Sequence, residues 1–408
     1  MQISQRKVNY SWQISNAQIN KYGYKYDISH FLLLLNYFTF ALLYTKRHVM
    51  QSIAIDVRMI NSSGIGTYLQ NLIPLVISNY PKIIFYLLGN KEKLEKYQKL
   101  KNVNVVNFKS PIYSIIEQFE FFKKTPEKAS LFWSPHYNIP LFFKGKLMVT
   151  VHDVFHLAMP QFVSGLDKKL YAKFMLNAVS KKADTIIFNS NFTSNEWSRL
   201  MKKNRGKTCI TYLGISKPFL SVYKKNNPHN NPFLLYVGNV KPHKNLACLI
   251  KAFTLIMDSI PHDLVIVGKK DGFITNDKNI IQETRLLGDR IFFTGQIDDN
   301  LLKQYYAHAS IMVHPSLYEG FGFTPLEAMA TSCPVIVSKV ASLPEICSDA
   351  ALYFNPYNFK ELADLIINLL NDKKLQEVMR AKGLEQAKKF TWEQTLKETC
   401  QVIDRLLQ

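Results

Sequence analysis

From Ser52 onward, short runs of apolar residues alternate with longer stretches in which apolar residues recur every three or four positions. Short apolar runs are typical of buried strands, and the three-to-four spacing is typical of helices with one buried face. Strands that alternate with helices in this way predict parallel sheets covered by helices. The predicted strands are Ile53–Val57, Ile83–Leu88, Val103–Phe108, Leu131–Trp133, Leu147–Val151, Thr185–Phe188, Phe233–Val237, Leu264–Val267, Ile291–Thr294, Ile311–His314 and Val335–Val337.

A polar segment divides this pattern into two halves. Ser221–Pro232 is rich in Asn and contains prolines, which indicates a linker. We therefore predict an α/β protein with two doubly wound, Rossmann-like domains, at 50–225 and 226–390, and a C-terminal helix at 391–408 that packs back on the first domain. Ligands of doubly wound sheets bind beyond the carboxyl ends of the strands, so we expect the site in the cleft where the two domains face each other.

The first 49 residues contain one long apolar segment, Phe31–Tyr44. It is shorter than the roughly 18–20 apolar residues that span a bilayer, and no small-residue cleavage site follows it. We expect the fold to begin near Met50, with residues 1–49 an extension that is not part of it. The alternative is that 1–49 is a short membrane-associating anchor.

Composition narrows the class of protein. With 47% hydrophobic and 20% charged residues among 408, the chain can bury a large core, and disorder as its main state is excluded. The five cysteines are odd in number and form no CxxC pair, which favours free thiols in a reducing compartment over disulfides or a zinc site. No group of residues has metal-ligand spacing, so we expect no metal and no other cofactor.

The net charge of +20 is concentrated in the first half. Residues 51–225 carry 26 basic and 10 acidic side chains, whereas residues 226–408 carry 19 and 20. A basic domain indicates an anionic partner, either a phospholipid surface or nucleic acid, with ordinary solubilising charge as the plain alternative. Nucleic acid is disfavoured because no zinc finger, RRM-type aromatic motif or helix-turn-helix signal is present. Pro111–Phe122, followed by Lys123 and Lys124, could lie on a membrane surface or form a core helix.

Two glycine- or lysine-containing loops resemble sites for phosphate. Gly64 and Gly66 lie between a predicted strand and a helix predicted over Thr67–Ser78, where a helix N-terminus favours anions. The third glycine of a dinucleotide fingerprint is absent, and a plain turn is the alternative. Pro74 lies inside this helix, so we expect the helix to begin late or to kink.

The second such loop, Val237–Asn245, also follows a strand. Lys241, His243 and Lys244 cluster there, where a diphosphate would find point charges, although solvated lysines are the alternative.

Glu319 and Glu327 lie eight positions apart in His314–Met329. Glu319 falls in a glycine-rich loop and Glu327 in the first turns of the next helix, and a carboxylate there stays ionised and can bind a ribose diol. The alternative is a solvated loop for Glu319 and dipole compensation for Glu327. The backbone of the loop is free to bind sugar oxygens at Gly320, Phe321, Gly322 and Phe323.

A polar pair, His152 and Asp153, ends the strand in Val149–His156. The pair could contact a transferred group in the cleft, while a structural histidine and a helix-capping aspartate are the alternative. Asn189–Thr193 contains a glycosylation sequon, but the cysteine pattern argues against secretion. We interpret this segment as a loop that caps a helix.

Taken together, these segments resemble glycosyltransferase family 4, also described as glycosyl transferases group 1. The resemblance runs from about Gln51 to Leu407 and is strongest in HPSLYEGFGFTPLEAMATSCPVIVS and SLPEICSDAALYFNP. It implies a GT-B fold, in which two Rossmann-like domains face each other across a cleft. It also implies a retaining transferase that moves a sugar from a nucleotide-sugar.

The resemblance assigns a role to each matching residue. Gly64 and Gly66 approach the donor diphosphate, His152 contacts the transferred hexose, and Lys244 neutralises the departing diphosphate. Glu319 lies close to the sugar and Glu327 binds the ribose, while Phe321–Phe323 supply backbone contacts. Many members carry Arg where this chain has Asn239, and Lys241 is the candidate to replace that charge, without the bidentate fork of arginine.

The function that follows is transfer of a hexose, with mannose from GDP-mannose as the first guess, to a saccharide acceptor. The acceptor expected is lipid-linked, in the synthesis of a surface polysaccharide such as O-antigen, capsule or exopolysaccharide. The location expected is the cytoplasm, peripheral at the inner face of the plasma membrane. The alternative enzyme is a glucosyl- or N-acetylhexosaminyltransferase that uses a UDP-sugar, and the alternative from another class is a basic nucleic-acid-binding protein.

Overall fold

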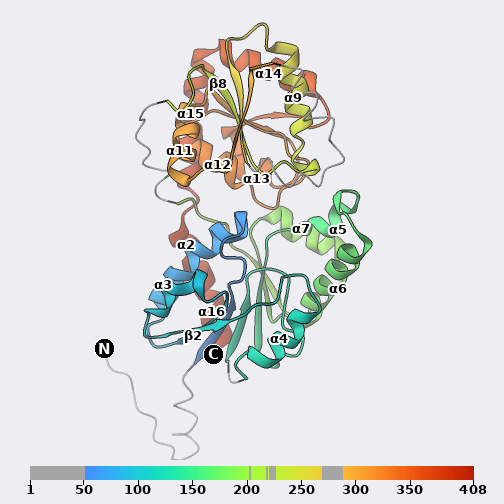
Figure 1. Cartoon of the computed structure of the whole chain (residues 1–408), viewed down its shortest axis with the longest axis vertical. Coiled ribbons are helices and arrows are strands. Elements are labelled where there is room, and N and C mark those ends of the chain that lie inside the picture. Colours follow the sequence, from blue (N-terminus) through green and yellow to red (C-terminus); the bar gives the residue numbers. More distant parts are fainter. Residues whose placement is uncertain (1–50, 128, 202–203, 217–218, 220–226, 269–287) are drawn as a thin grey trace, which may run out of the picture. The chain divides into compact units, whose positions relative to one another are not determined.

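The computed structural model describes residues 51–408 except 128, 202–203, 217–218, 220–226 and 269–287 (Figure 1). The predictions for residues 1–49, and most of the predicted linker, lie outside the described residues. Both sheets belong to one compact unit, Gln51–Gln408, and the domain boundaries near 225 and 390 stay predictions. Within the described part, no helix is both long and apolar enough to cross a bilayer.

The first half forms a parallel sheet of seven strands in the order β3-β2-β1-β4-β5-β6-β7. Ile53 of β1 pairs with Phe85 of β2 on one side and with Leu131 of β4 on the other. The strands are β1 (Ser52–Asp56), β2 (Ile84–Gly89), β3 (Val103–Asn107), β4 (Leu131–Ser134), β5 (Lys146–Val151), β6 (Thr185–Phe188) and β7 (Lys207–Ile210).

The second half forms a parallel sheet of six strands in the order β10-β9-β8-β11-β12-β13. The strands are β8 (Phe233–Val237), β9 (Asp263–Val267), β10 (Ile291–Gly295), β11 (Ile311–His314), β12 (Val335–Ser338) and β13 (Leu352–Phe354). Two doubly wound parallel sheets confirm the predicted fold class.

Helices cover both faces of each sheet (Figure 1). In the first half they are α2 (Ser63–Asn79), α3 (Glu95–Gln98), α4 (Ile116–Lys124), α5 (Phe155–Ala158), α6 (Leu166–Lys182) and α7 (Asn191–Leu200). In the second they are α9 (Leu246–Ile256), α11 (Asp299–His308), α12 (Phe323–Ala330), α13 (Leu343–Cys347), α14 (Phe359–Asn371), α15 (Lys373–Lys388) and α16 (Trp392–Leu407).

Alternation along the strands explains why both faces are covered. Ile53 and Ile55 of β1 enter the core beneath α2 and α16, while Ala54 enters the core beneath α4, α6 and α7. Successive side chains of a strand point to opposite faces, so an apolar run without alternation requires cover on both sides. The carboxyl ends of the strands are left uncovered by this arrangement, and polar loops follow them.

Helix α2 does not begin late, and the alternative expectation, a kink at Pro74, stays a prediction. It starts at Ser63 and continues through Pro74, so Gly64 and Gly66 lie in its first turn rather than in a preceding loop. Proline removes a single N–H donor, and the fully buried side chains around it, Leu72, Ile73 and Val76, hold the helix in place. A Cβ on residue 66 would lie 2.9 Å from the carbonyl oxygen of Ile60, so glycine permits the close turn into the helix.

The last helix, α16, packs against α2 of the first half. The Tyr80 hydroxyl donates to Asp404 Oδ1 at 2.7 Å, and Thr395 Oγ1 donates to the Tyr212 carbonyl at 2.8 Å. The chain therefore returns to the first sheet after completing the second.

Candidate active site

A cavity of about 660 Å³ lies where the loops after β5, β8 and β11 meet the start of α2. Of the twelve residues predicted for the site, ten line this cavity and two, Gly66 and Glu327, do not. The ten are Gly64, His152, Asp153, Lys241, Lys244, Glu319, Gly320, Phe321, Gly322 and Phe323. The structure thus brings most of the predicted residues together, while their individual roles stay predictions.

Lys244 and Glu319 form the charged centre of the cavity. Lys244 lies in a short turn, Pro242–Lys244, directly after β8, and its Nζ is 2.5 Å from Glu319 Oε1. The same Oε1 accepts hydrogen bonds from His314 Nε2 and Ser316 Oγ, each at 2.8 Å. His314 is fixed in turn by Thr324, whose hydroxyl is 3.0 Å from Nδ1. These donors hold the Glu319 side chain in one orientation.

The surroundings keep Glu319 ionised. Burial works against its charge, but the Lys244 ammonium and the hydrogen bond from His314 outweigh burial and hold the pKa of this carboxyl well below its ordinary range. Among the described residues, Glu319 Oε2 accepts no hydrogen bond, so this oxygen is left for a ligand in the cavity. The pair can therefore offer both a cation and a carboxylate oxygen to one bound molecule.

His152 offers an acceptor to the cavity. Its Nε2 is 2.9 Å from the Pro135 carbonyl, and burial lowers the pKa of the imidazole to about 4. A neutral imidazole beside a carbonyl must donate through that nitrogen, which leaves Nδ1 with a lone pair. Asp153 instead forms a local hydrogen bond, in which its Oδ1 accepts from the Phe155 N–H at 2.9 Å.

The glycine-rich loop after β11 approaches the first sheet closely. A Cβ on residue 320 would lie 2.1 Å from the His152 carbonyl oxygen, so only glycine fits there. The Gly320 carbonyl accepts from Ser190 Oγ at 2.7 Å and from Thr193 Oγ1 at 3.1 Å. Ser190 also caps α7 by accepting from the Thr193 N–H, which confirms the capping interpretation of this segment.

Glu327 lies on α12 outside the cavity lining. Its Oε2 accepts from the Tyr306 hydroxyl of α11 at 3.0 Å, and burial raises the pKa of the carboxyl to about 7. Unlike Glu319, this carboxylate has no cation among its described hydrogen-bond partners. The expectation that this carboxylate stays ionised is therefore wrong below about neutral pH, because burial raises its pKa, and the predicted contact with a ribose stays a prediction.

Glu345 of α13 joins the two halves and was not identified from the sequence. Its Oε1 accepts from the Asn191 N–H at 2.7 Å and its Oε2 from the Phe192 N–H at 2.8 Å, both in the first turn of α7. The Tyr212 hydroxyl donates to Oε1 at 2.8 Å. A carboxylate at a helix N-terminus is favourable, and here it links a helix of the second half to one of the first. Glu345 lies in the segment SLPEI, which is part of the family resemblance, but no local pattern in the sequence predicts its contact with Asn191.

Replacing Glu345 by alanine is expected to lower the free energy of unfolding by about 1 kcal/mol, because two N–H groups of α7 lose their acceptor. Thermal unfolding should show a lower midpoint than wild type. Glu377→Ala, which removes an exposed glutamate of α15, is the matched control and should leave the midpoint unchanged. Equal midpoints for the two variants would contradict a clamping role for Glu345.

The family model and the relatives that this chain matches are glycosyltransferases. Residues 221–386 match the family model described as Glycosyl transferases group 1. O-antigen chain mannosyltransferase B of Escherichia coli is 29% identical over 285 residues, which cover 67% of this chain and 73% of that protein. O-antigen chain mannosyltransferase RfbU of Salmonella typhimurium is 29% identical over 235 residues, which cover 57% of this chain and 63% of that protein.

Solved structures share the fold. Sucrose-phosphate synthase of Thermosynechococcus elongatus superposes with a TM-score of 0.69 at 21% identity, covering 87% of this chain and 99% of that one. WaaG, a glycosyltransferase involved in lipopolysaccharide biosynthesis, gives 0.68 at 14% identity, covering 86% and 99%. HepE of Anabaena, solved in complex with UDP-glucose, gives 0.68 at 17% identity, covering 87% and 99%. These similarities confirm the predicted GT-B fold.

Proposed function

Since this chain is a glycosyltransferase with a glycosyl transferases group 1 domain at residues 221–386, we propose that it transfers a hexose from a nucleotide-sugar to a saccharide acceptor. Mannose from GDP-mannose is the donor proposed, and a lipid-linked saccharide of a surface polysaccharide is the acceptor. The names of the two O-antigen mannosyltransferase relatives support mannose as the sugar and a surface polysaccharide as the product. The observation that carries the proposal is the Lys244–Glu319 pair in the cavity between the carboxyl ends of the two sheets.

Lys244 supplies the charge that the leaving group requires. In our proposal Glu319 holds its ammonium in place, and the ammonium pairs with the donor diphosphate as the bond to the sugar breaks. A fixed cation where negative charge develops lowers the barrier without reorganisation of water. Lys241 lines the same cavity and adds a second positive charge, in place of the arginine absent at Asn239.

The proposed transfer retains the anomeric configuration. The acceptor hydroxyl oxygen bonds to the anomeric carbon on the face from which the diphosphate leaves, and the hydroxyl proton passes to a phosphate oxygen of that leaving group. His152 does not serve as the base in this scheme, since its pKa of about 4 makes it a weak one. Its Nδ1 instead accepts a hydrogen bond from a hexose hydroxyl, and the protein acts by positioning and electrostatics.

Glu327 is proposed to bind the ribose diol, which gives a pH dependence. The pKa of Glu327 is raised to about 7, so the carboxylate that can accept two hydrogen bonds predominates only above that pH. Nucleotide affinity of the wild type should therefore rise between pH 6 and 8, by up to about tenfold per pH unit below the pKa. Isothermal titration of the nucleotide across this range should show a smaller rise in Glu327→Gln than in wild type, since the titration of the nucleotide phosphate is common to both proteins. If the affinities of wild type and Glu327→Gln changed equally with pH, Glu327 would not be a ribose-binding residue.

A donor panel tests the proposed function directly. Purified protein would be incubated with GDP-mannose, UDP-glucose or UDP-N-acetylglucosamine, and release of the nucleoside diphosphate would be followed with and without a lipid-linked saccharide. The expected result is release from GDP-mannose that the acceptor accelerates. Turnover of a UDP-sugar alone would overturn the mannosyl donor, and no turnover of any nucleotide-sugar would overturn the whole proposal.

A further inference from the structure

A second cavity, of about 1520 Å³, lies between α4 and α6 of the first half. Pockets for drug-sized ligands commonly measure about 300–1,000 Å³, so this groove suits a long ligand. We name it the α4–α6 groove, and its apolar walls include Tyr113, Phe119, Phe122, Tyr137, Leu170 and Phe174.

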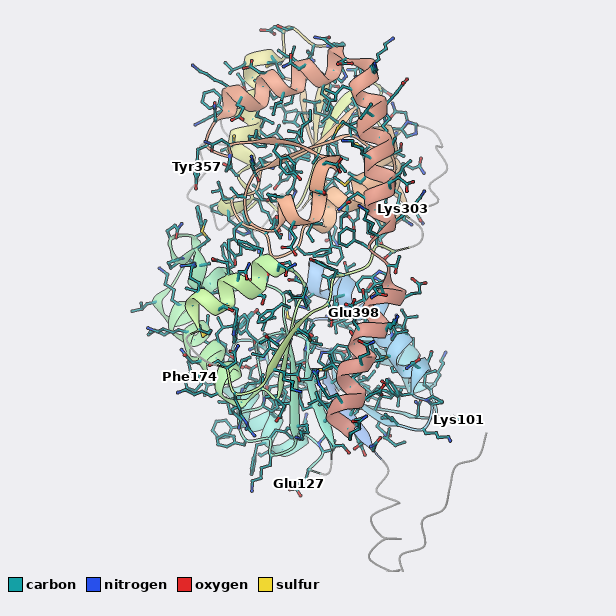
Figure 2. The ribbon with its side chains drawn as sticks, turned by 180° about the vertical axis from the view of Figure 1, so that it is seen from behind. Lys101, Glu127, Phe174, Lys303, Tyr357 and Glu398 are labelled. Carbon is teal, nitrogen blue, oxygen red and sulfur yellow. The ribbon has the colours of Figure 1, made fainter. Side chains whose placement is uncertain are left out.

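The groove exists because both helices carry apolar residues beyond those that the core needs. On α6, Met175 and Leu176 are buried against the sheet, while Leu170 and Phe174 follow a second stripe at helical spacing and stay exposed. Figure 2 shows Phe174 at the outer edge of this helix, where it is 58% exposed. On α4, Phe119 is 66% exposed and Phe122 is 72% exposed. A contiguous apolar surface of this kind marks a binding site on a soluble domain.

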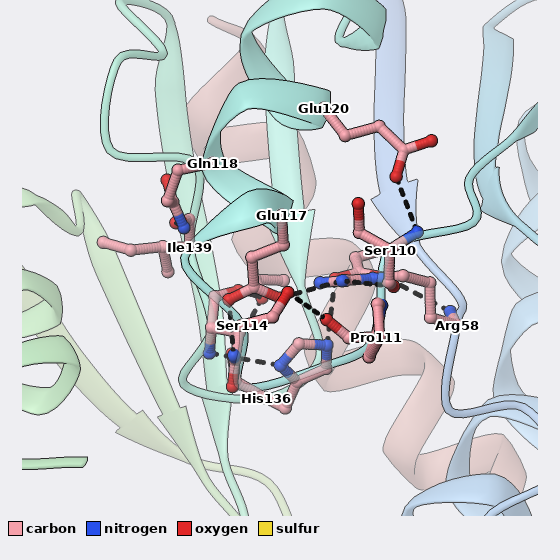
Figure 3. Close-up of polar contacts among 12 residues, drawn as sticks. Arg58, Ser110, Pro111, Ser114, Glu117, Gln118, Glu120, His136 and Ile139 are labelled. Carbon is pink, nitrogen blue, oxygen red and sulfur yellow. Dashed lines mark hydrogen bonds and ion pairs between the residues drawn. The ribbon is translucent and has the colours of Figure 1, made fainter. Parts of the chain in front are cut away.

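A buried polar network fixes the two walls of the groove, and Figure 3 shows the part of it around Arg58 and Glu117. Glu117 of α4 is fully buried and accepts from Arg58 Nη1 at 2.8 Å, and Arg58 also pairs with Asp56 at the end of β1. Tyr171 of α6 donates its hydroxyl to the same Glu117, and Asn138 donates to Glu117 Oε1 at 2.9 Å. Both helices are thereby tied to the sheet, so the groove is built before any ligand binds.

The groove adjoins the candidate active site. His156 and Lys168 line both the groove and the cavity that holds Lys244 and Glu319. Aromatic rings gather on the groove side of this junction, with the His156 ring 5.9 Å from Tyr137 and 6.3 Å from Tyr113. A ligand can therefore place an apolar part in the groove and a polar part in the active site.

Charge along the groove favours an anion. Helix α6 carries five lysines and one acid, Asp167, over its 17 residues. Lys168 stands at the junction itself and is exposed. On α4, Lys124 is paired with Glu120, whereas Lys123 is exposed. The lining itself contains one lysine, Lys168, and one acid, Asp167, while the other lysines of α6 and Lys123 lie outside it. An apolar groove on a basic helix, with Lys168 at its junction with the active site, is complementary to a lipid whose polar end is a diphosphate.

We propose that the α4–α6 groove binds the apolar chain of a lipid-diphosphate-linked saccharide, the acceptor of the transfer. The chain lies along Phe119 and Phe174, the diphosphate lies at Lys168, and the saccharide enters the cavity beside Glu319. This proposal rests on the proposed function, because it names the acceptor class for the same active site. It assigns to the groove a role that sugar transfer alone does not require.

Binding of farnesyl diphosphate, a soluble isoprenoid diphosphate without sugar, tests the groove separately from catalysis. Titration should show saturable binding to the wild-type chain, about tenfold or more tighter than for either farnesol or inorganic diphosphate, because only the intact probe uses both parts. Phe119→Ser and Phe174→Ser should each weaken binding by about tenfold. Tyr357→Ser, which removes a 77% exposed aromatic residue of the second half, is the matched control and should bind as wild type does. Lys168→Ala should remove the advantage of farnesyl diphosphate over farnesol.

Other occupants of the groove give other results. Binding to anionic vesicles without binding of farnesyl diphosphate would overturn the proposal in favour of a membrane surface. A dimer that Phe174→Ser dissociates would overturn it in favour of a second copy of this chain. Saturable binding that both phenylalanine variants leave unchanged would place the probe elsewhere and overturn it as well. Failure of the donor panel with groove-dependent probe binding intact would overturn the proposed function and leave the groove as a lipid-diphosphate site.

Discussion

Replacing Lys244 by alanine is expected to lower the rate of hexose transfer by about 10²–10³-fold. The ammonium is the cation nearest Glu319, at 2.5 Å, and it lies where we propose that the diphosphate departs. Removing it leaves the developing charge without its fixed counter-charge. Initial rates with saturating donor and acceptor measure the effect, since the loss should fall on kcat more than on KM.

Two further variants show whether a loss of transfer activity in Lys244→Ala is specific to the charge at this position. Lys251→Ala removes an exposed lysine of α9 and should keep wild-type rates. Lys244→Arg keeps a positive charge and should retain part of the activity, although a guanidinium does not match the compact ammonium. Near-normal turnover of Lys244→Ala would show that this lysine does not act on the leaving group. Circular dichroism would confirm that each variant is folded.

Glu319→Gln is expected to lower the rate by a similar factor, about 10²–10³-fold, for a different reason. Glutamine keeps the shape of the side chain but removes its negative charge. That charge orients Lys244, and it strengthens the hydrogen bonds that Oε1 accepts from His314 and Ser316. The free lysine should then hold the nucleoside diphosphate more tightly in the ground state while the sugar loses its carboxylate. Steady-state kinetics should therefore show a lower kcat with an unchanged or lower donor KM.

Glu377→Gln serves as the control for this second variant, because it changes an exposed glutamate far along the same half of the chain. It should retain wild-type values of kcat and KM. If Glu319→Gln instead raised the donor KM and left kcat untouched, the carboxylate would be a simple binding group. The proposed link between Glu319 and the orientation of Lys244 would then be wrong.

The sequence predicted every interior strand and two of the four edge strands, β3 and β10, but missed the edge strands β7 and β13. All eleven predicted strands are present within a residue or so at each end, because parallel strands with two covered faces consist of unbroken apolar runs. β7 was not predicted because Lys207–Ile210 forms an edge and only half of it is protected from solvent. β13 was not predicted because it has three residues. The start of α2 was misplaced because glycines usually favour loops over helices.

The candidate site could be predicted where its residues follow strands and not where they meet across the fold. Lys244 and Glu319 lie in the loops that follow β8 and β11, and these strands pair directly with each other, so their carboxyl ends bring both residues to the same end of the second sheet. The contact of Glu345 with Asn191 joins positions 154 residues apart, and no local pattern indicates it. The same holds for the α4–α6 groove, because exposed apolar residues on two helices look like core positions until the sheet is assembled.

Binding of nucleotides to wild type and to Lys244→Ala tests the central claim most directly. Isothermal titration would compare GDP and UDP with their monophosphates in both proteins and in Lys251→Ala. Our account predicts that Lys244→Ala weakens the preferred diphosphate by about tenfold or more, weakens its monophosphate much less, and leaves Lys251→Ala like wild type. Equal affinities of wild type and Lys244→Ala for the diphosphate would contradict it.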